Sequence, residues 1–352
     1  MKAATSITAP SGYWLLALGS LRVLLNRRGV FAGLGLALAI MIITGISLAS
    51  GAAGLSPWTA LAAAFGQGEP MHVFLVQELR LQRLVAGLLT GAAFGIGGCL
   101  LQTLARNRLA TPGVIGIDDG ATAFAVASIV AVPTTLAPSA LALTGATTAA
   151  VLAFGLSAGA GARGYRFIVV GIALGAVFGA LTNLMLARAD IDAANVAYPW
   201  TVGSLNARPA QAVWLLGVGL LLSLPLVKYL ALRLELMRFS DSVAVGLGVH
   251  LKAMRLLTLI TTVLLTALAV AVAGPVGLVA LAAPEMARYL SGHRGVPVLC
   301  SALAGALLMT VADWVGRTWL APIEIPVGVI TAVVGGPFLL WILLRPPARK
   351  LS

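Results

Sequence analysis

Long apolar stretches, separated by short polar segments and by proline and glycine, run through the whole chain. A helix needs roughly 20 apolar residues to cross a bilayer, and lipid offers no partner to unpaired backbone groups, so such stretches predict membrane-spanning helices. A membrane β-barrel would instead show ~10-residue segments of alternating polarity. We therefore predict an all-α polytopic membrane protein with about ten transmembrane helices, at residues 30–51, 84–105, 114–132, 138–160, 167–187, 210–227, 254–273, 276–291, 296–316 and 326–344.

Composition agrees with a protein that lies almost entirely in lipid. Of 352 residues, 60% are hydrophobic and only 10% are charged, and the mean hydropathy is +1.01. The first 29 residues contain several basic residues, and the first apolar stretch after them lacks a convincing cleavage site for a secretory signal. We interpret that stretch as an uncleaved anchor.

The basic residues are distributed unevenly between the two sides of the predicted helices. With ten spans and a cytoplasmic start, 18 of the 23 basic residues fall on the cytoplasmic side, and the others are Arg80, Arg83, Arg188, Arg208 and Arg317. This asymmetry predicts that both termini are cytoplasmic. The domains are then a cytoplasmic segment 1–29, a ten-helix transmembrane domain 30–345 and a cytoplasmic tail 346–352. Orientation in the membrane also explains the net charge of +12, so no nucleic-acid partner is expected.

Catalysis by this chain is not expected. The sequence has no glycine-rich phosphate loop with the Gly-Lys-Ser/Thr ending, and its histidines, His72, His250 and His293, fall in loops or at span edges rather than within a span. Cys99 and Cys300 are isolated and predict neither a disulfide nor a metal site. We therefore expect no enzyme activity, no catalytic residue, no metal and no cofactor in this chain.

The acidic residues argue against ion-coupled transport. A proton- or sodium-coupled carrier usually places acids at mid-membrane depth, whereas the acids here cluster at predicted span ends, with Asp313 the nearest to an exception. An ion-coupled secondary transporter is therefore not the favoured function, and it is kept as the alternative from another class of protein. The energy for transport is expected to come from another protein.

Several motifs occur together in one order along the chain, and their combination is much more specific than any one of them. They resemble the iron-chelate and vitamin B12 permease family of ABC importers over residues 30 to 345. The motifs are Arg80–Arg83, Gly91–Gly98, Leu101–Ala110, Thr111–Gly116, Ala273–Arg288, Ala312–Arg317 and Ile325–Phe338.

This resemblance implies a vitamin B12 permease-like (type II ABC importer) bundle in a bacterial cytoplasmic (inner) membrane. Its implied partners are a second permease subunit, favoured as a different chain rather than a copy, two ATPase subunits that bind ATP and Mg, and a periplasmic or lipid-anchored substrate-binding protein. The approach to Arg80 that contains Glu78, and the segment Val202-Gly-Ser-Leu205, are most similar to ferric-siderophore members. Haem or cobalamin is the alternative substrate.

Three arginines occur on the side where basic residues are scarce. By resemblance, Arg80, Arg83 and Arg317 match positions at which the family docks its binding protein through acidic side chains, and Arg–carboxylate pairs supply orientation as well as attraction. The alternative is that these side chains only reach toward lipid headgroups.

A second site is expected on the cytoplasmic side, within about residues 237–250. The segment is predicted to form a short helix capped by Ser240 or Asp241 and ended by Gly246 or Gly248. By resemblance this is the family's coupling helix, and Ser240, Asp241, Val245, Gly246, Leu247 and Gly248 would contact the ATPase. A plain surface loop is the alternative.

The segment after the fifth span is a third candidate. By resemblance it forms a gate beside the substrate path, and the residues considered are Asn183, Tyr198, Trp200 and Ser204, with a turn at Tyr198-Pro-Trp200. The two aromatic residues could equally belong to an interfacial belt.

Three positions depart from the pattern of the family that the chain resembles. Gln82 and Arg108 stand where proline is usual, and Glu285 stands where histidine is common. Gln82 is expected to soften a loop that presents Arg83, and Glu285 is expected to pair with Arg288 on one helical face.

Glycines recur every fourth residue in two spans: Gly87, Gly91 and Gly95, then Gly171, Gly175 and Gly179. Such stripes let helices approach closely. Packing within the chain is one interpretation of each stripe, and a role in dimer contact or gating is the other.

Overall fold

A computed structural model of the chain describes residues 10–18, 21–51, 54–131, 136–157, 165–292 and 295–344. The predicted tail 346–352, residues 1–9, residues 158–160 of the fourth predicted span and His293 lie outside the described residues.

The ten predicted spans correspond to ten helices in the same order, so the prediction of an all-α polytopic fold is confirmed. Their bounds are α1 Arg27–Ala49, α4 Gln82–Ala105, α5 Ile117–Val130, α6 Pro138–Leu156, α7 Tyr165–Arg188, α9 Ala210–Met237, α11 Leu251–Ala273, α12 Gly277–Ser291, α13 Val298–Thr318 and α14 Val327–Leu344.

Within the described residues, seven helical segments are long and apolar enough to cross a membrane. These are the segments that contain α1, α4, α6, α7, α9, α11 and α13. Helices α5 and α12, with 14 and 15 residues, are shorter, as is the apolar part of α14, Val327–Phe338.

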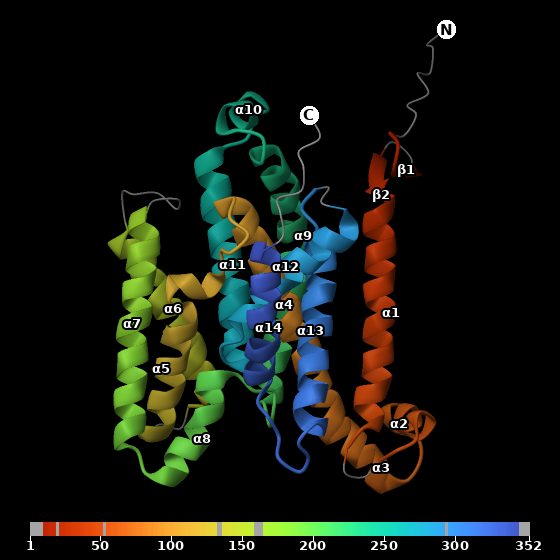
Figure 1. Ribbon diagram of the computed structural model, residues 1–352, viewed down its shortest axis with the longest axis vertical. Coiled ribbons are helices and arrows are strands. Elements are labelled where there is room, and N and C mark those ends of the chain that lie inside the picture. Colours follow the sequence, from red (N-terminus) through yellow and green to blue (C-terminus); the bar gives the residue numbers. More distant parts are fainter. Residues whose placement is uncertain are drawn as a thin grey trace.

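The helices form an elongated bundle with two distinct ends (Figure 1). A short helix, α10 (Asp241–Gly246), lies at one end, where α1 starts and α14 finishes. The short helices α2 (Pro57–Ala64), α3 (Pro70–Phe74) and α8 (Ile191–Val202) lie at the opposite end. We refer to these as the α10 end and the α8 end.

Helix α4 forms the centre of the bundle, and most of its residues from Leu84 to Leu104 are buried. Its glycines allow this position: a Cβ added at Gly91 would overlap the backbone carbonyl of Gly305 in α13, and one at Gly95 would overlap that of Ser301. The first glycine stripe thus packs within the chain. In the second stripe, Gly171 faces the carbonyl of Val114, whereas nothing lies within 4 Å of a Cβ at Gly179.

The entry into α4 differs from the prediction. A seven-residue π-helix, η1 (Leu75–Leu81), runs without a break from α3 into α4, so Arg80 and Arg83 lie on a helix. The expectation that Gln82 softens a loop is therefore wrong, because Gln82 has helical backbone angles and donates from Nε2 to Oε2 of Glu78 at 2.9 Å.

The predicted turn at Tyr198-Pro-Trp200 is also wrong, because these residues belong to α8. Pro199 has no N–H, so α8 lacks one backbone bond, to the carbonyl of Asn195, but the helix continues to Val202. Helix α9 continues to Met237, ten residues past the predicted end at 227.

Two further elements were not expected from the sequence. Residues of the N-terminal segment form an antiparallel hairpin, β1 (Tyr13–Leu18) with β2 (Leu21–Asn26), in which Tyr13 pairs with Asn26. A 3-10 turn, η2 (Pro112–Ile115), precedes α5 and delays its start to Ile117.

Candidate functional site

Four charged side chains from distant parts of the sequence meet at the α8 end, and we call Arg83, Asp313, Arg317 and Glu324 the ion cluster. Arg83 donates from Nε to Oδ1 of Asp313 at 2.8 Å and from Nη1 to Oε2 of Glu324 at 2.7 Å. Arg317 donates from Nε to the other oxygen of Asp313 at 3.1 Å. The two arginines and two carboxylates balance in charge.

Asp313 forms the centre of the ion cluster. Its side chain is only 6% exposed, and both of its oxygens receive a guanidinium. A buried carboxylate is costly unless it is paired and hydrogen-bonded in this way. The arginines are themselves mostly buried, at 12% exposed for Arg83 and 13% for Arg317.

Arg80 lies close to the ion cluster but bonds to backbone instead. Its Nη1 donates to the carbonyl oxygens of Leu48 at 2.6 Å and Ala49 at 3.2 Å. These carbonyls belong to the last turn of α1, where unpaired C=O groups and the helix dipole favour a cation. Arg317 reaches the same helix by donating from Nη2 to Oγ of Ser47 at 2.6 Å.

The three arginines predicted as a docking surface are thus brought to one end of the bundle, but their guanidinium groups already bond within the chain. Their partners Asp313, Glu324 and Ser47 were not assigned to this site from the sequence. Arg83 and Glu324 are 241 residues apart, so only the unusual depth of Asp313 in its span pointed to any of them.

The segment Trp319–Pro326 joins α13 to α14 and carries Glu324. The N–H of Ile325 donates to the carbonyl of Gly316 at 2.9 Å, and that of Gly328 donates to the carbonyl of Gly203 at 3.1 Å. The ion cluster is therefore tied through a few residues to the start of α14 and to the end of α8.

The residues considered for a gate are only partly brought together. The guanidinium of Arg208 lies 4.1 Å from the ring centre of Trp200 and donates from Nε to the carbonyl of Ser204 at 2.9 Å. Trp200 is 7% exposed and Ser204 6%, so an interfacial-belt role does not fit Trp200. Tyr198 is 51% exposed, and Asn183 lies on an exposed face of α7.

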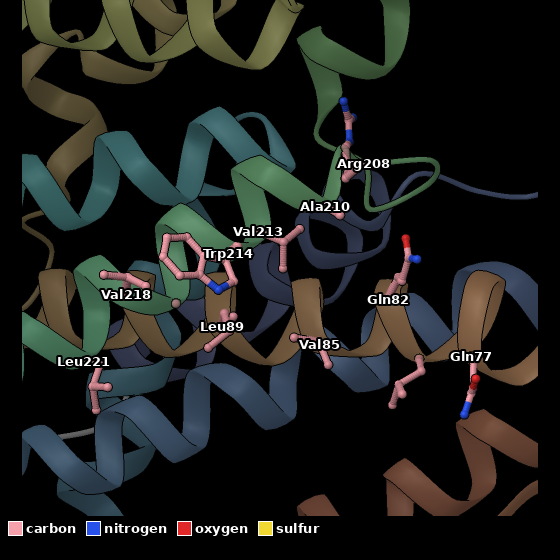
Figure 2. Close-up of a pocket in the computed structure, with 12 residues that line it drawn as sticks. Gln77, Gln82, Val85, Leu89, Arg208, Ala210, Val213, Trp214, Val218 and Leu221 are labelled. Atoms are coloured by element: carbon pink, nitrogen blue, oxygen red, sulfur yellow. The ribbon is translucent and has the colours of Figure 1, made fainter. Parts of the chain in front are cut away.

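Arg208 is a residue that the sequence did not single out. Burial and the positive charge of Arg83 lower the pKa of Arg208 to about 10, and its buried Nη2 has no hydrogen-bond partner. Figure 2 shows it at one end of an apolar groove between α4 and α9, with Val213 and Trp214 further along. The groove has a volume of about 440 Å³.

At the α10 end, the short helix forms as predicted. Ser240 is its N-cap, and its Oγ accepts from the N–H of Val243 at 3.2 Å. Gly248 ends it with a φ of +79°, and the N–H of Val249 returns to the carbonyl of Ala244. The segment is thus a capped helix, and its contact with an ATPase stays a prediction.

The helix is anchored on one side and open on the other. Asp241 accepts from Arg106 at 3.2 Å and from Arg255 at 2.5 Å, which fixes α10 to the ends of α4 and α11. Val245 and Leu247 are 56% and 55% exposed, and nothing lies within 4 Å of a Cβ at Gly246. An anchored helix with exposed apolar residues suits contact with another protein.

Among the described residues, no group of three or more His, Cys, Asp and Glu side chains is placed to hold a metal ion. The arrangement instead has a mostly buried ion cluster at one end of a multi-span bundle and an exposed capped helix at the other. It defines a multi-pass membrane protein.

Comparison with known proteins gives the family. Residues 38–345 match the FecCD transport family, and the chain belongs to it. It is 36% identical over 330 residues to the Fe(3+)-citrate import system permease protein YfmE of Bacillus subtilis (strain 168), which covers 92% of this chain and 98% of that protein. It is 34% identical over 311 residues to the ferric enterobactin transport system permease protein FepG of Escherichia coli (strain K12), covering 88% and 94%.

Other comparisons agree with this family. The hemin transport system permease protein HmuU of Yersinia pestis is 33% identical over 292 residues, covering 79% of this chain and 85% of that protein. A solved structure of a proposed metal-chelate type ABC transporter, in an inward-facing conformation, superposes with a TM-score of 0.77 at 26% identity and covers 90% of this chain and 100% of that one.

Proposed function

We propose that this chain is the transmembrane permease subunit of an ATP-driven, binding-protein-dependent importer of a ferric siderophore. The observation that carries the proposal is the placement of two different contact surfaces at opposite ends of one bundle. The ion cluster with Arg80 lies at the α8 end, and α10 with exposed Val245 and Leu247 lies at the α10 end. Iron-chelate permeases among the relatives support the substrate class.

Each end suits one partner. Arginines at the α8 end would receive acidic side chains of a periplasmic or lipid-anchored binding protein. Helix α10 would sit on an ATPase subunit, which binds ATP and Mg and performs the hydrolysis. Large polar chelates do not cross lipid, so a second permease, favoured as a different chain rather than a copy, would complete a path between the subunits.

The proposed location is a bacterial cytoplasmic membrane with both termini in the cytoplasm. Support comes from the basic residues of the α10 end, among them Arg106, Arg108, Arg238 and Arg255, since basic residues are normally retained on the cytoplasmic side. The start of α1 lies at this same end.

The test is uptake by the complete importer in proteoliposomes, with ferric siderophores, ferric citrate, haem and cobalamin offered in turn. We expect ATP-dependent accumulation of a ferric siderophore. ATP-dependent uptake of haem alone would favour the alternative that the HmuU relative supports. Uptake that needs an ion gradient and no ATP would overturn the importer in favour of a secondary transporter.

Partner composition is tested separately. A tagged chain purified in mild detergent should carry an ATPase and a second, different permease, detected by mass spectrometry. An ATPase with only copies of this chain would show a homodimer.

A further inference from the structure

The proposed docking role meets a geometric difficulty in the ion cluster. Arg83 is 12% exposed and already donates to two carboxylates, Asp313 and Glu324. Nη1 of Arg83 donates to Glu324 at 2.7 Å and to Oδ1 of Asn206 at 3.4 Å. An acidic side chain of a partner can therefore bond to Nη1 only if Glu324 leaves.

The two carboxylates differ in how firmly they are held. Asp313 is 6% exposed and is shared by Arg83 and Arg317. Glu324 is 46% exposed, lies on the segment between α13 and α14, and contacts Nη1 of Arg83 through one carboxylate oxygen. Removing Asp313 would leave two buried cations facing each other, whereas removing Glu324 costs one partly exposed ion pair.

We propose that Glu324 occupies the position of the partner's carboxylate, and that the binding protein docks by replacing Glu324 on Nη1 of Arg83. This rests on the proposed docking function. The site takes a carboxylate side chain, with Asp313 and Arg317 keeping their mutual bond throughout. Replacement conserves the charge balance of the ion cluster, so no buried charge is left unpaired.

Two other cations make the exchange favourable for an acidic surface. Arg80 bonds to neutral carbonyls, and Arg208 stacks on Trp200 and donates to a carbonyl. Arg80 is close enough to Arg317, and Arg208 to Arg83, for their charges to interact. These two cations leave a local positive surplus beside the balanced ion cluster, which attracts an acidic partner.

The exchange has a structural consequence, because Glu324 is two residues before Pro326 and three before the first residue of α14. The N–H of Gly328, in the first turn of α14, bonds to the carbonyl of Gly203 at the end of α8, and a Cβ at Gly328 would overlap the carbonyl of Val202. Releasing Glu324 therefore removes the ion pair that ties this segment to Arg83, while the backbone bond from Ile325 to Gly316 remains. Docking would thereby reach the segment considered for the gate.

The test compares two neutral substitutions in the complete importer in nanodiscs, with affinity for the binding protein measured by calorimetry. Glu324→Gln removes the internal competitor, so we expect about tenfold tighter binding, the effect of one charge-assisted hydrogen bond that no longer has to be broken. Glu78→Gln is the matched control: Glu78 is an exposed acid at the same end whose side chain accepts from Gln82. Its loss changes the surface charge equally, and we expect less than a twofold effect.

Arg83→Gln separates this inference from the proposed docking site. Weaker binding with Arg83→Gln together with unchanged or weaker binding with Glu324→Gln would overturn the exchange and leave the docking site intact. Unchanged binding with Arg83→Gln would overturn both. If Glu324→Gln and Glu78→Gln raised the affinity for the binding protein equally, the cause would be general surface charge. That outcome would also overturn the exchange.

A second measurement tests the release itself. A spin label at Ile323→Cys, on a side chain that is 70% exposed, should become more mobile when the binding protein is added. In the Glu324→Gln importer the label should already be mobile before the addition. A label whose spectrum does not change in either experiment would contradict release of the segment.

Discussion

Arg108 and Glu285 form an ion pair in which Nη1 of Arg108 lies 3.0 Å from Oε1 of Glu285. Arg288 donates to the other oxygen at 2.8 Å from Nη2 and at 3.0 Å from Nε, which confirms the expected pairing of Glu285 with Arg288. By the resemblance seen in the sequence, Arg108 and Glu285 are two of the three expected departures from the family pattern. The structure shows that the two departures contact each other, joining the segment after α4 to α12.

The first prediction is that Glu285 contributes more to the free energy of unfolding than Arg108 does. Glu285→Gln should lower the free energy of unfolding by about 2 kcal/mol, because it leaves the guanidinium of Arg288, which is only 13% exposed, without its carboxylate. Arg108→Gln should cost about 0.5 kcal/mol, since Arg108 is 59% exposed. Thermal unfolding in detergent measures both, and equal costs would contradict this account.

The second prediction restores the usual family residues at both positions. Arg108→Pro with Glu285→His should retain more uptake than Glu285→His alone, because the single change leaves Arg108 and Arg288 facing each other without a carboxylate. Uptake per folded permease, with Arg108→Pro alone as the control, measures this. A double variant no better than Glu285→His would show that the two positions are independent.

The third prediction concerns the centre of the ion cluster. Asp313→Asn should destabilise the permease by about 3 kcal/mol, because two mostly buried guanidinium groups lose their shared carboxylate. Glu324→Gln should cost no more than about 1 kcal/mol, because its side chain is 46% exposed. The two unfolding temperatures should therefore separate clearly. A smaller loss for Asp313→Asn than for Glu324→Gln would show that the cluster does not depend on Asp313.

The fourth prediction tests α10 as a contact for the ATPase. Gly246→Leu should leave folding unchanged, because a Cβ there meets nothing within 4 Å and the residue has no positive φ. It should nevertheless reduce transport and uncouple ATP hydrolysis, since the added side chain projects from a surface proposed to fit a partner. Gly35→Leu, at an equally open position on α1, is the control. Normal transport by Gly246→Leu would argue against this contact.

The fifth prediction concerns the close approach of α4 and α13. Gly91→Ala should destabilise the bundle by about 2 kcal/mol, because its Cβ would overlap the backbone of Gly305 and neither helix can move freely in a packed core. Gly179→Ala is the matched change in open space on α7, and the stability of the isolated chain should not respond to it. If Gly179→Ala lowered stability as much as Gly91→Ala, close helix packing would not be the cause.

The sequence determined the order of the predicted helical spans, and it predicts the sidedness of the charges. Both are one-dimensional properties, since a span needs only a sufficient apolar length and orientation depends on counts of basic residues. It also determined α10, because a capping serine and a glycine with positive φ act within a few residues of each other. Local sequence rules failed where a helix continues through residues that predict a loop or a turn. The π-helix Leu75–Leu81 packs against α2, and α8, which contains Pro199, packs against α5. Residue propensities do not include such contacts between distant elements.

Only the tertiary structure decided what the predicted arginines bind. Arg83 meets Asp313 and Glu324 across 230 and 241 residues, and Arg108 meets Glu285 across 177. Nothing in the local sequence specifies such pairs, because they depend on which helix faces which. The physical reason is that buried charges must be paired: the sequence shows that unusual arginines exist, and the packing of α4 against α13 determines which carboxylates neutralise them.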